Sequence, residues 1–131
     1  MSIKYRLTPL KDNISNKPKK GYYAQVVTKG TIDSHTLCKH IASGCALSLA
    51  DMTAALVALS ESIQNYLLDG YNVNIDGIGT FSVSAESKIV GESEEMHAQS
   101  VEVKHVNFRS SVSMKQAMKQ AKFKREVEAK G

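Results

Sequence analysis

Residues 70–83 constrain the fold of this chain more than any other segment, because they combine a helix stop, two short strands and a tight turn. Apolar and polar residues alternate over 71–76 and again over 81–85, which is the two-residue period of half-buried strands. Between the two runs, Gly77 and Gly79 give the backbone the freedom that a tight antiparallel reversal requires. The segment therefore predicts a β-hairpin that directly follows a helix.

A long amphipathic helix is predicted before this hairpin, over about residues 49–68. Ser48 and Asp51 have the spacing of a capping box, in which each side chain accepts a backbone N–H group at the helix start. Gly70 is a typical helix stop. Twenty residues span about 30 Å, so the apolar stripe of this helix is longer than one short helix can cover. The stripe consists of Met52, Leu56, Leu59, Ile63 and Leu67.

A shorter helix is predicted to begin after Asp33, which is a suitable N-cap residue. Cys38 and Cys45 lie seven positions apart on it, or about 10 Å along a helix axis, which is too far for a disulfide between them. Both cysteines are therefore predicted to be small buried thiols in a reducing compartment. The apolar face of this helix consists of Leu37, Cys38, Ile41, Ala42 and Cys45.

The N-terminal segment has the composition of two strands, over 3–7 and 22–27, separated by a polar loop that contains Pro18. The loop carries three clustered lysines, at positions 17, 19 and 20. Lys17, Lys19 and Lys20 are candidate contacts for a polyanion. The alternative is a solvated loop whose charges serve solubility.

The ordered motifs of the chain resemble those of the bacterial HU and integration host factor family of DNA-bending proteins, and most closely the HU-like variants with an extra N-terminal segment. The resemblance runs without a gap over 33–81 and includes the Gly-Ile-Gly-Thr-Phe string at 77–81. Residues 106–109 and 114–117 are similar to the closing strand and the terminal helix of the family. The order of the motifs carries the resemblance, because none of them is specific alone.

The resemblance implies an α+β fold, in which a helical hairpin joins a three-stranded antiparallel sheet with a β-ribbon arm and a C-terminal helix. Residues 31–131 would form this HU-like DNA-binding domain, and residues 1–30 would add strands and a basic loop to a single domain overall.

An intertwined homodimer is expected, because HU-like subunits intertwine and because one copy of such an open layer cannot close its own apolar face. A heterodimer with a paralogue would bury the same apolar stripe equally well. The expected dimer core includes Leu56, Leu59, Ile63, Phe81 and Phe108.

The distribution of charge is more informative than the total, which is a modest +4 with a pI of about 9.1. Residues 1–20 contain six Lys or Arg against one acid, and residues 104–131 contain eight against two. The intervening residues, 21–103, contain three Lys or Arg against ten acids. This polarity predicts one face suited to a polyanion and another that is not.

The C-terminal part holds the strongest candidates for phosphate contacts. Strand parity changes between 101–105 and 106–108, which predicts a bulge near Lys104 or His105. The final helix is predicted to begin near residue 113 and to present three lysines on one face. The alternative is an ordinary surface helix whose lysines serve only solubility. The DNA-contact candidates are Lys88, Lys104, His105, Arg109, Lys115, Lys119 and Lys122, of which Arg109 and Lys115 match basic positions of the family.

The predicted arm departs from the family pattern, in which a proline wedges between base pairs of bent DNA. Residues 84–100 contain no proline and carry four acids, Glu86, Glu92, Glu94 and Glu95, against the single Lys88. Carboxylates that face phosphates oppose binding. Ile89, Val90 and Met96 are candidate apolar wedges, although such residues more often pack on their own ribbon.

Catalysis and cofactor binding find no support in the sequence. His35, Cys38 and His40 do not share a helix face and have no second ligand pair at zinc-site spacing, so no metal site is expected. The glycines at 77 and 79 precede a strand rather than a helix, which excludes a dinucleotide fingerprint. No cofactor, small-molecule substrate or membrane partner is expected. The expected location is cytoplasmic and nucleoid-associated.

Two hypotheses about function remain. The first is an HU-like architectural protein that binds duplex DNA with low sequence specificity through phosphate contacts. The second keeps the HU fold but makes it a protein-interaction or assembly module, whose acidic arms engage a basic partner.

Overall fold

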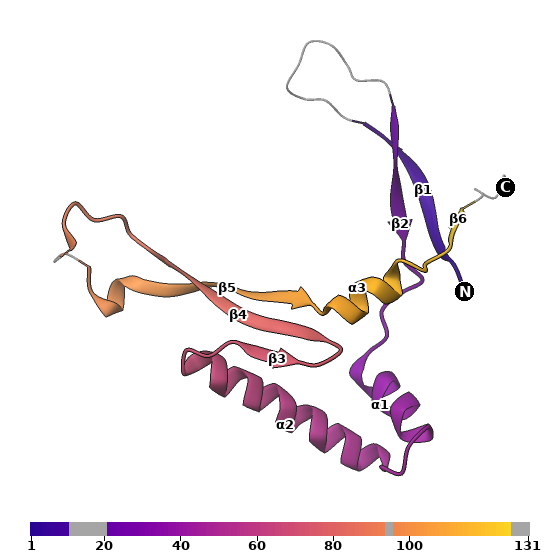
Figure 1. Ribbon diagram of the computed structural model, residues 1–131, viewed down its shortest axis with the longest axis horizontal. Coiled ribbons are helices and arrows are strands. Elements are labelled where there is room, and N and C mark those ends of the chain that lie inside the picture. The colour runs from indigo at the N-terminus through magenta and orange to yellow at the C-terminus, as the bar shows by residue number, and fades with distance from the viewer. Residues whose placement is uncertain (11–20, 94–95, 127–131) are drawn as a thin grey trace. The chain divides into compact units, whose positions relative to one another are not determined.

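The computed structural model describes residues 1–10, 21–93 and 96–126 of the chain, and side chains throughout these ranges except that of residue 99. They belong to two compact units, each with one three-stranded sheet (Figure 1). Unit 1 consists of Met1–Asp33 with Met118–Gly131, and unit 2 is Ser34–Ala117. No helix in the described ranges is long and apolar enough to cross a membrane.

Unit 2 begins with the helices α1 (Ser34–Ser43) and α2 (Leu49–Leu68). The predicted capping box is confirmed: the Ser48 hydroxyl accepts from the Asp51 N–H at 3.1 Å, and the Asp51 carboxylate accepts from the Ser48 N–H at 3.4 Å. Gly70 follows α2 with a φ of +90°, which favours glycine. The limits of α2 are therefore fixed by local sequence at both ends.

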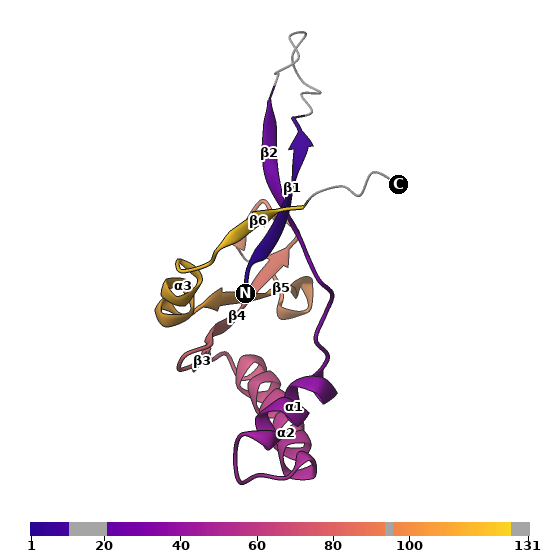
Figure 2. The ribbon, with the colours of Figure 1, turned by 90° about the vertical axis from the view of Figure 1, so that its right-hand side faces the viewer.

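The sheet of unit 2 is antiparallel and contains β3 (Val73–Ile75), β4 (Gly79–Ser87) and β5 (Val101–Ser110) in the order β3-β4-β5. The predicted hairpin and three-stranded sheet are confirmed. A short 3-10 turn, Ala98–Ser100, leads into β5, and α3 (Val112–Met118) follows it. Helix α2 contacts β3 and β4, and in both views α1 and α2 lie on one side of the sheet (Figures 1 and 2).

The apolar face of this sheet is only partly covered within one copy of the chain. Phe81 and Phe108 pair across β4 and β5 with ring centroids 5.0 Å apart, yet Phe108 remains 51% exposed. On α2, Leu59 is 41% exposed, whereas Leu67 is buried. Among the apolar side chains described, only Cys38 and Leu67 are buried, so unit 2 retains a large exposed apolar surface.

The two cysteines have different environments. Cys38 is 2% exposed and lies on α1, as predicted. The prediction that Cys45 is a buried residue of the same helix is wrong: α1 ends at Ser43, the Gly44 N–H turns back to the Ile41 carbonyl, and Cys45 is exposed. Both thiols are free, as expected.

Unit 1 is built on β1 (Ile3–Pro9), β2 (Tyr22–Val27) and β6 (Phe123–Arg125), in the order β2-β1-β6. The β1–β2 pair is antiparallel and confirms the two predicted N-terminal strands. Strand β6 pairs in parallel with β1, where the Ile3 N–H donates to the Lys122 carbonyl and the Glu126 N–H to the Tyr5 carbonyl. This C-terminal strand was not predicted.

Candidate nucleic-acid interface

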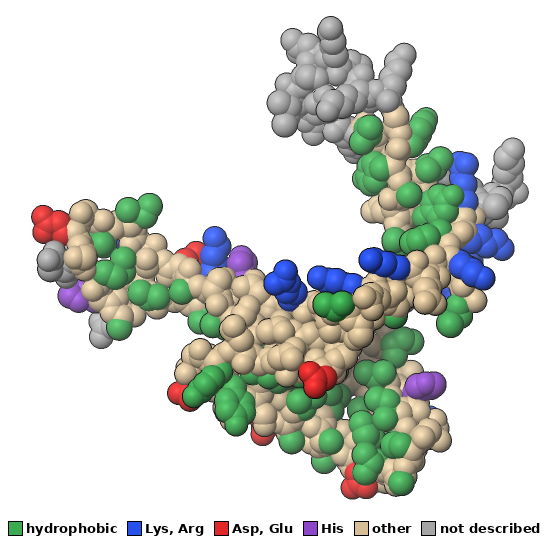
Figure 3. All heavy atoms as spheres, viewed as in Figure 1, with side chains coloured by type: hydrophobic (Ala, Val, Ile, Leu, Met, Phe, Trp, Pro, Cys, Tyr) green, Lys and Arg blue, Asp and Glu red, His purple; other side chains and the backbone are tan. Residues whose placement is uncertain are grey.

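The face of the β3-β4-β5 sheet that carries no helix is polar. Residues paired directly across two antiparallel strands share a face, and on this face the pairs of β4 and β5 combine hydroxyl groups with basic or amide groups. These pairs are Thr80 with Arg109, Ser82 with Asn107, and Ser84 with His105. Figure 3 shows Lys, Arg and His side chains gathered on the side of the sheet opposite α1 and α2.

Arg109 and Lys115 border one depression, which has a volume of about 460 Å³. Both side chains are exposed. The rest of the lining combines hydroxyl and amide groups with Gly77, the apolar Val112 and one carboxylate, Asp76, which opposes an anion. The other polar lining residues are Asn74, Thr80, Ser110, Ser111 and Ser113.

Local hydrogen bonds bring Arg109 and Lys115 to the same place. The Ser111 N–H donates to the Ile78 carbonyl at 2.9 Å, which ties the end of β5 to the β3–β4 turn. The Ser111 hydroxyl then accepts from the Met114 N–H at 3.1 Å, as an N-cap side chain does. Helix α3 therefore starts immediately after β5, and Lys115 lies in the helix only six positions after Arg109.

Hydrogen bonds between side chains also fix the opposite side of the depression. The Thr80 hydroxyl donates to the Asn74 amide oxygen at 3.0 Å, and the Asn74 amide donates to the Asp76 carboxylate at 3.3 Å. The Ser111 and Ser113 hydroxyls are 3.2 Å apart. These bonds fix the orientations of the polar groups, so the depression is a preformed polar surface with a net positive border.

The predicted bulge lies at Lys104. Ser84 pairs with His105 and Ala85 pairs with Val103, so Lys104 is the extra residue of β5. The bulge restores the alternation between the two parts of β5: Val103 and Val106 share the apolar face, whereas His105 falls on the polar one. The change of parity in the sequence was therefore a correct signal.

The prediction that Lys115, Lys119 and Lys122 form a stripe on the last helix is wrong. Helix α3 ends at Met118, and the Ala121 N–H turns back to the Met118 carbonyl. Lys119 lies in that turn and Lys122 leads into β6, so both belong to unit 1 rather than to the helix. The helix stops because the following residues pair with β1.

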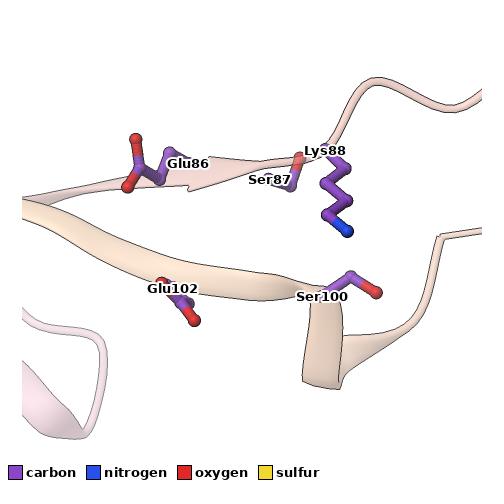
Figure 4. A pocket seen from close by; sticks show the side chains of 5 residues that line it. All are labelled: Glu86, Ser87, Lys88, Ser100 and Glu102. Carbon is purple, nitrogen blue, oxygen red and sulfur yellow. The ribbon is translucent and has the colours of Figure 1, made fainter.

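The arm formed by β4 and β5 is acidic near the end of the paired region. Glu86 and Glu102 are directly opposite in the strand register, and both are exposed. In Figure 4 their carboxylates diverge, while the Lys88 side chain extends between the strands toward Ser100. Like charges placed opposite each other destabilise a strand pair, and the divergence of the two carboxylates (Figure 4) reduces this repulsion.

The remaining arm residues are partly described. Ile89, the first wedge candidate, is fully exposed and packs on neither strand; Val90 is half-buried and Met96 is 36% exposed. Glu94 and Glu95 lie outside the described residues. Lys17, Lys19 and Lys20 also lie outside them, so the structure does not place these predicted contacts.

The sequence analysis identified the basic residues of this site but not the uncharged hydroxyl-bearing residues that line it. Thr80, Ser111 and Ser113 were not singled out, although a run of serines between a strand and a helix is a typical N-cap signal. Within the described residues, no three His, Cys, Asp or Glu side chains are grouped as metal ligands would be.

The fold is similar to that of a protein from Bacteroides vulgatus ATCC 8482, described as a "Putative bacterial DNA binding protein", with a TM-score of 0.70 and 16% identity. The match covers 99% of this chain but 51% of the other, so the chain spans about half the length of that protein. A comparison with curated proteins finds no match. The model of a family described as an HU domain fused to wHTH, Ig or glycine-rich motifs matches residues 1–125, and the chain belongs to this family.

Proposed function

We propose that the chain is an HU-like architectural protein that binds duplex DNA with low sequence specificity, mainly through phosphate contacts. The observation that carries this proposal is the convergence of Arg109 and Lys115, with a set of fixed hydroxyl groups, on the face of the sheet that no helix covers. Membership of an HU-domain family supports it. The name of the structural neighbour supports the same class of ligand.

The chemistry of the face explains why specificity would be low. Arg, Lys, Ser and Thr are the side chains that commonly bind phosphate oxygens, and phosphate contacts position a protein without reading the sequence. Lys104 and His105 would extend the same contact along β5 toward the arm. The protein would thus follow the backbone of the duplex rather than its base edges.

A homodimer is part of the proposal. The exposed apolar side chains of α2 and of the sheet would pack against a second copy, as in intertwined HU-like subunits. Two copies would also double the number of phosphates reached, and with it the salt dependence of binding. A nucleoid-associated, non-enzymatic role follows from this proposal.

Replacing Arg109 or Lys115 with glutamine should weaken duplex binding by a similar factor for every sequence. Each side chain is proposed to neutralise about one phosphate in each subunit, so each substitution should reduce the slope of log K against log[salt] by about 0.9 per subunit, or about 1.8 for the dimer. Fluorescence anisotropy with two duplexes of unrelated sequence, at several salt concentrations, measures both effects.

Lys39→Gln is the matched control for these two variants. Lys39 is exposed and carries the same charge, but it lies on α1, on the other side of the sheet. Its loss should leave the salt slope unchanged. Equal effects of all three substitutions would show that only net charge matters, and binding that ignores salt would refute the proposal.

Bending of the duplex should be gentle. The arm segment 84–100 lacks the proline with which kinking members of the resembled family open base steps, and the paired acids of β4 and β5, Glu86 and Glu102, repel phosphates. Energy transfer between the ends of a short labelled duplex should therefore change little on binding. A sharp kink would show that another residue, with the fully exposed Ile89 as the first candidate, acts as the wedge.

The acidic arm favours a second candidate function, an assembly module in which the arm engages a basic protein. Its specific support is the Glu86–Glu102 pair, because a cationic partner would neutralise two carboxylates that oppose each other in the strand register. A mobility-shift titration at two salt concentrations distinguishes the candidates. No retardation of duplex at moderate salt, together with a partner lost in Glu86→Gln/Glu102→Gln, would favour the assembly role.

A further inference from the structure

The sheet of unit 1 has two faces of opposite character. Side chains alternate along β1, and its register with β2 and β6 shows which residues share each face. One face is mainly apolar and consists of Ile3, Tyr5, Leu7, Pro9, Tyr22, Ala24, Val26, Phe123 and Arg125. The other face is mainly polar and consists of Lys4, Arg6, Thr8, Tyr23, Gln25, Val27 and Lys124.

Three cations cluster on the polar face. Lys4 and Lys124 are directly paired on neighbouring strands, which lie about 4.8 Å apart, and Arg6 follows Lys4 two residues along β1, at about 7 Å. All three are exposed. We call this set the β1–β6 cationic face. Figure 3 shows Lys and Arg side chains gathered at the β6 side of unit 1.

The neighbours of these cations are neutral hydrogen-bonding groups. The Thr8 hydroxyl donates to the Gln25 amide oxygen at 2.9 Å across β1 and β2, which supports the assignment of both residues to this face. One carboxylate borders this face, because Glu126 follows Lys124 by two positions and its N–H continues the β1–β6 ladder by donating to the Tyr5 carbonyl. Three cations against this one carboxylate leave the face with a net positive charge, and like charges this close repel one another unless an anion binds between them.

Unit 1 as a whole also has an excess of positive charge. Its described residues hold seven Lys or Arg side chains against two carboxylates, those of Asp33 and Glu126. Apart from Met118, the last residue of α3, the residues of unit 1 that the structure describes contain no helix. A flat, exposed, cationic and hydrogen-bonding surface is suited to the phosphate backbone of a nucleic acid.

We propose that the β1–β6 cationic face is a second DNA-binding surface, distinct from the Arg109–Lys115 site of unit 2, and that it contacts duplex phosphates through Lys4, Arg6 and Lys124. This inference rests on the proposed function. Duplex DNA is favoured over an anionic membrane because apolar side chains, which a membrane-surface site inserts beside its cations, lie mainly on the opposite face of this sheet.

The test is the full-length triple variant Lys4→Gln/Arg6→Gln/Lys124→Gln. Three lost phosphate contacts in each subunit should reduce the slope of log K against log[salt] by about 2.7 per subunit, or about 5.4 for the dimer, and weaken duplex binding at least roughly tenfold. Thermal unfolding followed by circular dichroism shows whether the sheet is intact. The sequence signal for this face is the alternation of Lys4 and Arg6 with apolar residues of β1.

Arg125→Gln and Lys124→Gln form the sharpest matched pair. The two residues are adjacent in β6 and both are exposed, but Arg125 pairs with Tyr5 on the mainly apolar face and Lys124 pairs with Lys4 on the cationic one. Lys124→Gln should reduce the salt slope by about 0.9 per subunit, or about 1.8 for the dimer, and Arg125→Gln should not. Equal effects of the two substitutions would overturn the proposal.

The outcomes separate this inference from the proposed function. Wild-type protein that fails to bind duplex refutes both. Wild-type binding that falls in Arg109→Gln but not in the folded triple variant refutes only the second surface. Binding of phosphatidylserine vesicles that falls in the triple variant, while duplex binding does not, would assign the face to membranes and also overturn the proposal.

Discussion

A Gly79→Ala substitution is expected to lower the free energy of unfolding by about 3 kcal/mol or more. Gly79 is buried where β4 meets β5. A Cβ atom at this position would overlap the carbonyl oxygen of Arg109 and lie 2.8 Å from ring atoms of Phe108. The carbonyl belongs to a paired strand, so it cannot move without opening the sheet, whereas the half-exposed Phe108 ring can shift. Urea denaturation measures the loss.

Gly44→Ala is the control for this substitution. The nearest atom to a Cβ at position 44 is the Ile41 carbonyl oxygen at 3.7 Å, which is an ordinary contact. Its effect on the free energy of unfolding should stay within about 0.5 kcal/mol. Equal midpoints for the two variants would show that β5 shifts to accommodate the methyl group, contrary to the packing argument.

The close approach at Gly79 also matters for the candidate DNA-binding face. The next residue, Thr80, pairs with Arg109, and both border the depression that contains Lys115. Side-chain volume at position 79 would push β5 away from β4 and move the Arg109 backbone with it. The Gly-Ile-Gly-Thr-Phe string thus links the packing of the hairpin to the geometry of the site.

The parts of the fold that local sequence determines were predicted from it. The capping box at Ser48 and the glycine at position 70 mark the two ends of α2, and the alternation over 71–85 defines the hairpin. The bulge at Lys104 was also predicted, because a change of strand parity needs an extra residue wherever the two strands stay paired.

The C-terminal strand was missed because its cause is not local. Strand β6 has only three residues and forms a parallel pair with β1, over a hundred positions earlier in the chain. The spacing of Lys115, Lys119 and Lys122 fits a helix equally well, and no proline or glycine marks the break. Pairing with β1 outweighs helix propensity here, so only the tertiary structure shows which lysines share a face.

The basic residues of the candidate site were singled out from the sequence, but the way in which they come together was not. Arg109 and Lys115 stand out as basic residues in the sequence, but their convergence depends on two contacts made by Ser111, with Ile78 and with Met114. The cations of unit 1 were overlooked for a related reason. Lys4 and Arg6 look like isolated charges until strand register places Lys124 beside them.

A Leu59→Asp substitution is expected to abolish the proposed dimer and, with it, most of the ordered structure of unit 2. Leu59 is 41% exposed within one copy although it lies in the apolar stripe of α2. In the dimer this side chain would be buried, and an unpaired carboxylate there costs several kcal/mol. Light scattering coupled to size exclusion should show a lower mass than for the wild type, and circular dichroism a loss of helix.

Asn65→Asp adds the same charge to the same helix at an exposed polar position, and it should keep the dimer mass. A second measurement isolates association from simple misfolding. If folding and dimerisation are coupled, the wild-type unfolding temperature must rise with protein concentration. A wild-type temperature independent of concentration, or a Leu59→Asp variant with unchanged mass, would mean that a single copy is stable despite its half-exposed Phe108. DNA contacts would then come from the basic residues of a single copy rather than from a symmetric pair of copies.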